Sequence, residues 1–276
     1  MKPYLLLLAA TMLAACSTKQ APSTEPTTAD DPTVITLNDG TTVNWLKDNP
    51  GQRLMDRGLF ADAPDSLFEA LGLQEGIPSS VSTFLMKADD EWILFDTGLG
   101  AAHGGQTVNV LDSLGIPTAD INKIYITHFH GDHIGGLVQE GQSVFANATL
   151  YVGSVEYKAW IEEMPEERNS QQREAMEAYK DRLVLFEFGD TLPHNVIALD
   201  AVGHTPGHTA FEKGELLIIG DLMHGAALQM EHPEYNANFD MDKVKAAESR
   251  VRIIQYAREK GLTMAGMHLP EPAFMK

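Results

Sequence analysis

Short segments rich in β-branched, aromatic and aliphatic residues recur along the chain, separated by glycine, proline, asparagine and aspartate. Such segments are typical of β-strands bounded by turns. The predicted strands cover residues 34–37, 42–45, 81–87, 91–95, 121–126, 149–152, 182–186, 196–201, 215–219 and 262–265. Asp89-Asp90 joins the third and fourth of these strands into a hairpin. Residues 47–79 are rich in Gly, Pro and Asp, and no element can be assigned there.

Apolar residues at helical spacing occur between the predicted strands. One helix is predicted over residues 107–114, and another is expected to begin near residue 134. The charged segment 154–180 has apolar residues at helical spacing, which predicts one or two helices with one face in solvent. The last helix is expected to start at Asp240 and to end before Gly261.

The first residues follow a different pattern, with a basic Lys2, an apolar run over residues 5–13 and small residues up to Cys16. This pattern indicates an export signal, because the run is far shorter than the ~20 apolar residues that span a bilayer. The sequence LAAC at residues 13–16 resembles the lipobox of bacterial lipoproteins, which predicts that residues 1–15 are a signal peptide and that Cys16 is lipidated. The alternative is an ordinary signal peptide whose removal discards Cys16.

Lipidation would anchor the exported chain to the bacterial envelope, and Ser17 is compatible with the outer membrane, facing the periplasm. Residues 16–33 are rich in Ser, Thr, Pro and Ala without an apolar period, which predicts a disordered tether. Residues 34–276, about 240 in number, fit one folded domain large enough to bury a substantial core.

The chain contains 39 Asp and Glu residues against 20 Lys and Arg residues, which gives a formal net charge of −19. A surface with this charge repels nucleic-acid phosphates and anionic membranes, so no nucleic-acid partner is expected and a nuclease is disfavoured. Cys16 is the only cysteine, which excludes an internal disulfide, a thiol nucleophile and a thiolate ligand in the mature domain.

The densest group of reactive side chains follows the predicted strand 121–126, where His128, His130, Asp132 and His133 lie within six positions. Burying these groups as packing residues is costly, because each needs its own polar partner. Residues two apart on an extended backbone point to the same side, so His128 and His130 can bind one ion. Asp132 and His133 follow a glycine bend and can reach a second ion. We interpret the group as a site for paired metals; the alternative is a polar loop that contains several histidines by chance.

Other candidate ligands also follow predicted strands. His204 is the third candidate ligand of the first metal, and His268 follows the last strand. Asp221 can bridge two cations through its two oxygens, the alternative being a helix N-cap. His208 is expected either to orient a ligand or to be a turn residue. His224 lies one helical turn after Asp221 and can face the same cavity.

These motifs resemble those of the metallo-β-lactamase superfamily over nearly the whole mature domain. They are HFHGDH at residues 128–133, GHTPGH at 203–208, GD at 220–221 and GMHLP at 266–270. The turn at Asp96 is similar to the family's first motif, although aspartate at a strand end is also common in ordinary turns. The resemblance implies an α/β fold, a four-layer αβ/βα metallo-β-lactamase sandwich in which two mixed β-sheets pack face to face, with metals at one edge.

The resemblance also implies how the ligands are shared between two Zn²⁺ ions or other divalent transition metals. His128, His130 and His204 would hold one ion, Asp132, His133 and His268 would hold the other, and Asp221 would bridge them. Further residues are expected to support the ligands or to line the pocket, namely Asp96, Phe129, His208 and His224. Flavodiiron relatives have an acid in place of His130, so this histidine indicates hydrolysis rather than redox chemistry.

The resemblance further implies a mechanism. Two divalent ions that share a water can lower its pKa from ~16 toward ~7, which produces hydroxide at neutral pH. This hydroxide would attack a carbonyl or phosphorus centre without a serine or cysteine nucleophile. Asp132 is the expected catalytic residue, because it can orient the hydroxide and collect its proton.

Residues 220–240 and 246–250 resemble the branch that contains methyl parathion hydrolases and acyl-homoserine lactonases, which implies small neutral substrates such as esters, lactones or phosphotriesters. β-Lactam antibiotics are the alternative substrate class, and a catalytically inactive, metal-binding surface lipoprotein is the alternative of another kind. The sequence is also compatible with a homodimer. Only eight residues follow His268, which is fewer than this branch would lead us to expect. We therefore expect one wall of the pocket to be absent or to be supplied by a partner. The candidates for the tyrosine that lactonases place over the metals are Tyr157, Tyr179 and Tyr235.

Overall fold

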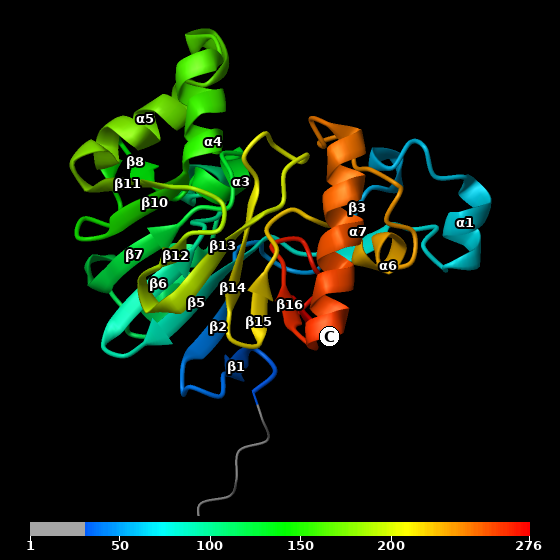
Figure 1. Ribbon diagram of the computed structural model, residues 1–276, viewed down its shortest axis with the longest axis horizontal. Coiled ribbons are helices and arrows are strands. Elements are labelled where there is room, and N and C mark those ends of the chain that lie inside the picture. Colours follow the sequence, from blue (N-terminus) through cyan, green and yellow to red (C-terminus); the bar gives the residue numbers. More distant parts are fainter. Residues whose placement is uncertain (1–30) are drawn as a thin grey trace, which may run out of the picture. The chain divides into compact units, whose positions relative to one another are not determined.

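The computed structural model describes residues 31–276, and the predicted signal peptide, Cys16 and residues 16–30 of the predicted tether lie outside the described residues. Two β-sheets dominate the described part (Figure 1). In neighbour order, the seven-stranded sheet consists of β1 (Val34–Thr36), β2 (Thr42–Lys47), β5 (Ser82–Ala88), β6 (Glu91–Phe95), β7 (Ile121–Tyr125), β10 (Thr149–Gly153) and β11 (Leu183–Phe186). The six-stranded sheet consists of β12 (Thr191–Leu192), β13 (Val196–Asp200), β14 (Thr209–Lys213), β15 (Leu216–Ile218), β16 (Thr263–Ala265) and β17 (Phe274–Met275).

Shorter elements connect and flank the two sheets. The α-helices are α1 (Asp65–Ala70), α2 (Thr107–Ser113), α3 (Gly131–Ile134), α4 (Ser154–Tyr157), α5 (Ser170–Tyr179), α6 (Ala226–Gln229) and α7 (Lys243–Lys260). A π-helical turn covers Lys158–Glu163, and 3-10 turns cover Arg57–Leu59, Ala101–His103, Thr118–Asp120, Glu166–Arg168, Lys180–Arg182 and Pro193–Asn195. Two small antiparallel pairs are formed by β3 (Arg53–Met55) with β4 (Ile77–Ser79) and by β8 (Val138–Gln139) with β9 (Gln142–Ser143). Within residues 31–276, no helix is both long enough and apolar enough to cross a membrane.

Both sheets contain parallel and antiparallel neighbours, as the α/β prediction requires. Strands β6, β7, β10 and β11 run parallel to one another, whereas β1, β2, β5 and β6 pair antiparallel. In the second sheet, β15 and β16 are parallel and the other neighbours are antiparallel. Parallel neighbours need a crossover connection, and α2 lies in the connection between β6 and β7.

The two sheets pack face to face around a shared apolar core. Phe95 of the first sheet and Phe211 of the second have ring centroids 5.6 Å apart, and the centroids of Tyr125 of the first sheet and Phe211 are 5.7 Å apart. All three side chains are buried. Aromatic pairs at this spacing contribute about 0.5–1.5 kcal/mol each beyond the area that they bury. These contacts therefore help to hold one sheet against the other.

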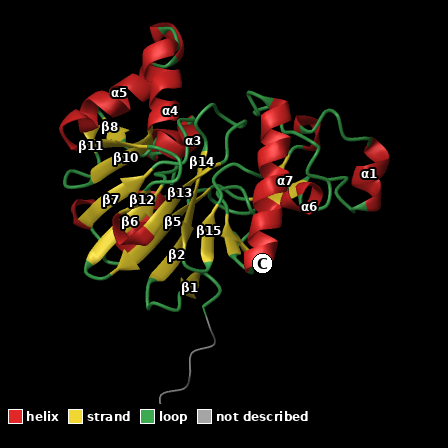
Figure 2. Ribbon diagram, viewed as in Figure 1, coloured by secondary structure: helices red, strands yellow, loops and turns green. Residues whose placement is uncertain are grey.

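Helices cover the outer faces of both sheets (Figure 2). Leu94 and Ile124 point out of the first sheet into a cluster with Leu111 of α2 and Met176 of α5. On the other side, Ile253 of α7 packs with the six-stranded sheet. The order of layers is helices, sheet, sheet and helix, which is the predicted αβ/βα sandwich.

The prediction of a helix that begins near residue 134 is wrong, because α3 ends at that residue and the chain continues into β8 and β9. Two glycines explain the stop. A Cβ on Gly135 would lie 2.2 Å from the carbonyl oxygen of Leu99, and one on Gly136 would lie 2.2 Å from that of Thr97. The segment passes so close to the loop after β6 that it has no room for the side chains of a longer helix.

Two other differences concern the second half of the chain. Strand β14 was not predicted, because it contains the polar residues Glu212 and Lys213, yet both are buried: Glu212 accepts from Tyr256 of α7, and Lys213 donates to Asp39. Helix α7 begins at Lys243 rather than at Asp240, since the side chain of Asp242 accepts a hydrogen bond from the Lys245 N–H and caps the helix. Asp240 is left free for another role.

The unassigned residues 47–79 form a small unit with its own core. Phe60, Phe68 and Ile77 are buried in a third apolar cluster, together with Leu228 of α6 and Ala237. The pattern of short, irregular elements gave no period from which this packing could be inferred. The cluster joins the N-terminal segment to the loop that follows α6, so this loop has a fixed support.

Candidate metal centre

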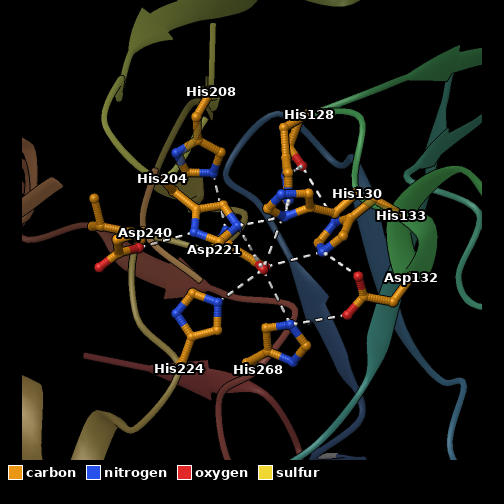
Figure 3. A network of polar contacts seen from close by, with 12 residues as sticks. His128, His130, Asp132, His133, His204, His208, Asp221, His224, Asp240 and His268 are labelled. Atoms are coloured by element: carbon orange, nitrogen blue, oxygen red, sulfur yellow. Dashed lines mark hydrogen bonds and ion pairs between the residues drawn. The ribbon is translucent and has the colours of Figure 1, made fainter. Parts of the chain in front are cut away.

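The candidate ligands converge because their strands end at the same edge of the sandwich. The loop after β7 carries His128, the loop between β13 and β14 carries His204, and Asp221 follows β15 closely. His268 follows β16, which runs parallel to β15. The N–H of Thr209 donates to the carbonyl oxygen of Thr127 at 2.9 Å, which ties the two sheets together at this edge. Figure 3 shows the other nine labelled side chains gathered around Asp221 or around the histidines next to it.

The carboxylate of Asp221 is surrounded by imidazole nitrogens. Its Oδ1 lies 3.1 Å from Nε2 of His133, and its Oδ2 lies 3.1 Å from His268, 3.1 Å from His224, 3.3 Å from His204 and 3.8 Å from His128, all through Nε2. The Asp221 side chain is 2% exposed. A buried carboxylate among nitrogen donors from both sheets lies at the centre of the site.

Among the described residues, four overlapping groups of possible metal ligands lie around this carboxylate; two of them include His224, and the other two consist of the predicted ligands. In each group the candidate ligand atoms lie within 4.8 Å of one another. The first group consists of His128, His130, His204 and Asp221, and the second of Asp132, His133 and His268. In the first group, Nδ1 of His130 lies 3.1 Å from Nε2 of His128 and 2.9 Å from Nε2 of His204. In the second, Asp132 Oδ2 lies 3.3 Å from Nε2 of His268. The structure thus brings together all seven predicted ligands.

Hydrogen bonds on the far side of each ring decide which nitrogen faces the site. Nδ1 of His133 donates to Asp96 at 2.7 Å, and Nδ1 of His268 donates to the carbonyl oxygen of Ser80 at 2.9 Å. Nδ1 of His204 donates to Asp240 at 2.9 Å. In each neutral ring the proton sits on Nδ1, so Nε2 presents a lone pair toward Asp221.

The arrangement of lone pairs fits divalent cations. Nε2 of His133 and Oδ1 of Asp221 are buried, face each other and have no hydrogen-bond partner, although both are acceptors in the tautomer just described. Acceptors that face one another in a buried site repel unless a cation or a proton lies between them. Nitrogen and carboxylate donors without thiolates are a common ligand set for zinc. The residues therefore fit the metal centre that the motifs predicted.

Burial and neighbouring charges set the protonation of the rings. Burial and the nearby His204 hold the pKa of His130 down to about 3, so its imidazole is neutral at pH 7 and can act as a ligand. Burial also lowers the pKa of His268, but the carboxylates of Asp221 and Asp132 outweigh this effect and raise the pKa to about 10. Metal binding requires the neutral ring, so it would release this proton.

Asp96 and His208 support the ligands rather than join them. Asp96 accepts from Nδ1 of His133 and from the N–H and hydroxyl of Thr127. Nε2 of His208 accepts from the backbone N–H of Asp221 at 3.0 Å, while its Nδ1 donates to the carbonyl oxygen of Ala201. His208 thus fixes the backbone of Asp221 and has no nitrogen left for a metal.

The side chains of Phe129 and of the three candidate tyrosines pack in apolar clusters and do not form a wall of the site. The Phe129 ring is buried in the apolar cluster outside the first sheet. The Tyr179 hydroxyl donates to the carbonyl oxygen of Leu137 in the same region, and Tyr157 packs at the edge of that cluster. Tyr235 packs with the cluster around Phe60. One turn after Asp221, the side chain that faces the site is His224 instead.

Two residues that support the ligands, Asp240 and Arg250, were not predicted from the sequence. Asp240, expected at a helix start, accepts from His204 through Oδ1 and from Arg250 through Oδ2 at 3.0 Å. The Arg250 guanidinium is 1% exposed and also donates to the carbonyl oxygen of Leu222. The only sequence signal for this contact was an arginine in an otherwise apolar helical stripe, where an unpaired charge would be costly.

Comparison with known proteins agrees with this geometry. A family model described as Metallo-beta-lactamase superfamily matches residues 76–268. The hydrolase AbOPH, a solved structure of the beta-lactamase superfamily, is 28% identical with a TM-score of 0.77, and the match covers 87% of this chain and 91% of that one. AidC, a dizinc quorum-quenching lactonase solved with a product, is 25% identical with the same TM-score of 0.77, covering 87% and 91%.

Among curated relatives, ribonuclease Z of Prochlorococcus marinus strain MIT 9301 is 40% identical over 73 residues, which is 24% of this chain. The chain spans only 21% of the length of that relative. The family model, by contrast, extends from the strand β4 region to His268 and includes every predicted ligand. Its match over most of the chain, together with the sandwich fold and the buried cluster of histidine and aspartate at its edge, shows that this protein belongs to the metallo-β-lactamase superfamily.

Proposed function

We propose that this protein is a dinuclear zinc hydrolase that acts on neutral esters, lactones or phosphotriesters. The position of Asp221 carries the proposal. Its Oδ1 faces His133 of the second donor group at 3.1 Å, and its Oδ2 faces His204 of the first group at 3.3 Å. A carboxylate between two sets of nitrogen donors can hold two cations that would otherwise repel each other.

When bound, two zinc ions would supply Lewis acidity toward the substrate and an acidified water as the nucleophile. The chain's own part is to place acids and bases around that water. Asp132 is assigned the catalytic role, because its side chain is 27% exposed whereas that of Asp221 is 2% exposed. Asp132 can therefore reach both the water and the solvent, and can take up a proton and release it.

The rim of the site supports a neutral substrate with an apolar group. Phe239 is 46% exposed and its ring centroid lies 5.6 Å from that of His224. The N–H of Met241, a residue whose surface is 50% exposed, donates to the carbonyl oxygen of His204. In the described part of the chain, every ion-pair partner of Asp221 is a histidine, so no lysine or arginine contacts the carboxylate at the centre of the site. Apolar walls with few polar groups are typical of sites for small neutral ligands.

The likeness to the hydrolase AbOPH supports hydrolysis, and the likeness to the dizinc lactonase AidC supports lactones as substrates. We also propose that Cys16 is lipidated and anchors the exported protein to the envelope, although Cys16 lies outside the described residues. Palmitate labelling of cells that express the full chain, compared with a C16A variant, tests the anchor. Labelling that is equal in both would contradict it.

The proposed function is tested with purified, zinc-loaded protein and four substrates. These are an acyl-homoserine lactone, an aryl ester, paraoxon and a chromogenic cephalosporin, each with and without a chelator. We expect chelator-sensitive turnover of at least one of the first three at a higher kcat/KM than the cephalosporin. A preference for the cephalosporin would make the protein a β-lactamase. No turnover of any of the four would leave a metal-binding protein without catalysis.

A further inference from the structure

Glu156 is a buried carboxylate for which the ligand assignment has no role. It lies in α4 and is 1% exposed. Its Oε1 accepts from the backbone N–H of Phe129 at 2.8 Å. Its Oε2 accepts from the hydroxyl of Thr205 at 2.9 Å and from the backbone N–H of Gly207 at 2.8 Å. One side chain thus joins two loops that are far apart in the sequence.

Both loops carry donors of the first group. Phe129 stands between His128 and His130, and Thr205 directly follows His204. The first loop follows β7 of the seven-stranded sheet, whereas the second joins β13 to β14 of the six-stranded sheet. The spacing of the three histidines therefore depends on how the two sheets are held at this edge. Glu156 is attached to both sides of the junction.

The loop that carries Gly207 packs closely against α4, so the two segments have no room to shift relative to each other. A Cβ on Gly207 would lie 2.2 Å from the backbone nitrogen of Glu156, so the second loop packs directly against α4. Burial raises the pKa of Glu156, which reflects the cost of a charge in this position. Three donors offset that cost, and removing the acceptor would leave two backbone N–H groups buried without a partner.

We propose that Glu156 is a positioning residue that sets the distance between His204 and the pair His128 and His130. The inference rests on the proposed metal centre and is independent of the substrate. Donors of the second group are not attached to Glu156. Asp132 and His133 lie in α3, and His268 is held by the carbonyl oxygen of Ser80. Loss of the Glu156 carboxylate should therefore affect one metal and not the other.

The test is an E156Q variant of the full chain, because glutamine keeps the size and one acceptor oxygen but turns an amide N–H₂ toward one of the two backbone N–H groups that the carboxylate accepts from. Co²⁺ is titrated into metal-free protein, and the two binding steps are followed by absorption and by calorimetry. Outer residues that orient ligands contribute about 10–100-fold in metal affinity. We expect one step to weaken by about tenfold or more, with the other step unchanged. Hydrogen exchange of the metal-free variant should rise at residues 127–133 and 203–208.

The matched control is D48N. Asp48 is also fully buried, and its carboxylate accepts from the N–H groups of Leu99, Gln106 and Thr107, but the loop that it holds carries no donor of the first group. D48N should lower the stability of the fold without weakening the binding step that E156Q weakens. If E156Q does not fold, T205V removes one donor and leaves the carboxylate in place. T205V should then show a smaller loss at the same step.

Three results would overturn the inference. Unchanged affinities at both steps in E156Q would remove the role and leave the metal centre standing. An equal loss at both steps, matched by D48N, would mean that Glu156 serves the stability of the fold in general. Wild-type protein that binds no Co²⁺ would overturn both this inference and the proposed function.

Discussion

His204 and Asp240 are joined by a hydrogen bond of 2.9 Å from the imidazole Nδ1 to a carboxylate oxygen. Both side chains are buried, and the other oxygen of Asp240 accepts from Arg250 at 3.0 Å. Because Nδ1 keeps its proton, Nε2 of His204 presents its lone pair toward His130 and Asp221. The carboxylate therefore selects the tautomer in which His204 can act as a ligand.

The D240N variant tests this relationship. We expect affinity for one metal to fall by about 10–100-fold, because His204 loses the partner that orients it. The free energy of unfolding of the metal-free protein should fall by about 1.5–3 kcal/mol, since Arg250 loses a charged, buried partner. Competition with a chelating dye and urea unfolding measure the two effects. The control is E231Q, which breaks the exposed pair with Arg258 and should change stability by less than about 1 kcal/mol. Wild-type affinity in D240N would contradict the orienting role.

His224 contacts Asp221 at 3.1 Å but belongs to neither set of predicted ligands. Its Nδ1 is buried without a hydrogen-bond partner. We expect an H224A variant to bind two metals per chain, as measured by inductively coupled plasma analysis after dialysis. We also expect its KM to change, since His224 lies between Asp221 and the exposed Phe239. If the metal content drops to one ion per chain, His224 is a ligand and the assignment must be revised.

Asp132 combines a partly exposed side chain with contacts to two site histidines. The D132A variant should lower kcat by about 10²–10⁴-fold, because the group assigned to orient the water and collect its proton is lost. Its far-ultraviolet circular dichroism should match that of the wild type, since no buried apolar contact is removed. D65N, which alters an exposed carboxylate paired with Arg57, is the control and should retain full activity. A near-normal rate in D132A would remove the catalytic assignment.

Metal binding should release protons near neutral pH. The pKa of His268 in the metal-free protein is raised to about 10 from an ordinary value of 6.5. This ring is therefore protonated at pH 7, and zinc affinity should increase as the pH rises from 6 to 8. The same shift stabilises the metal-free fold below pH 6.5, and this stabilisation is lost as the pH rises toward 10. Calorimetry of zinc binding at pH 7 in buffers with different ionisation enthalpies counts the protons. No proton release would contradict the pKa of His268.

The local pattern of residue types was sufficient to predict most strands and the positions of the candidate ligands in the chain. β7, β15 and β16 were predicted to within one or two residues at their ends, because strand composition repeats over a few neighbours. His128, Asp221 and His268 follow these strands closely, so their convergence at one edge could be inferred from the chain alone. The sandwich fold was predicted from the order of the motifs, because the spacing of apolar residues in a strand does not specify which sheet the strand joins.

The sequence by itself determined which side chains are available as ligands and where strands place them. Only the tertiary structure decided what surrounds those ligands. Asp240 and the carbonyl oxygen of Ser80 accept from histidines 36 and 188 positions distant, and Glu156 accepts from Thr205, 49 positions distant; no local spacing predicts such contacts. Likewise, the apolar side chains of the irregular residues 47–79 form a core only because they pack against Leu228 of α6. Periodicity reports on neighbours along the chain, whereas the tautomer and spacing of each ligand depend on groups that only packing brings near.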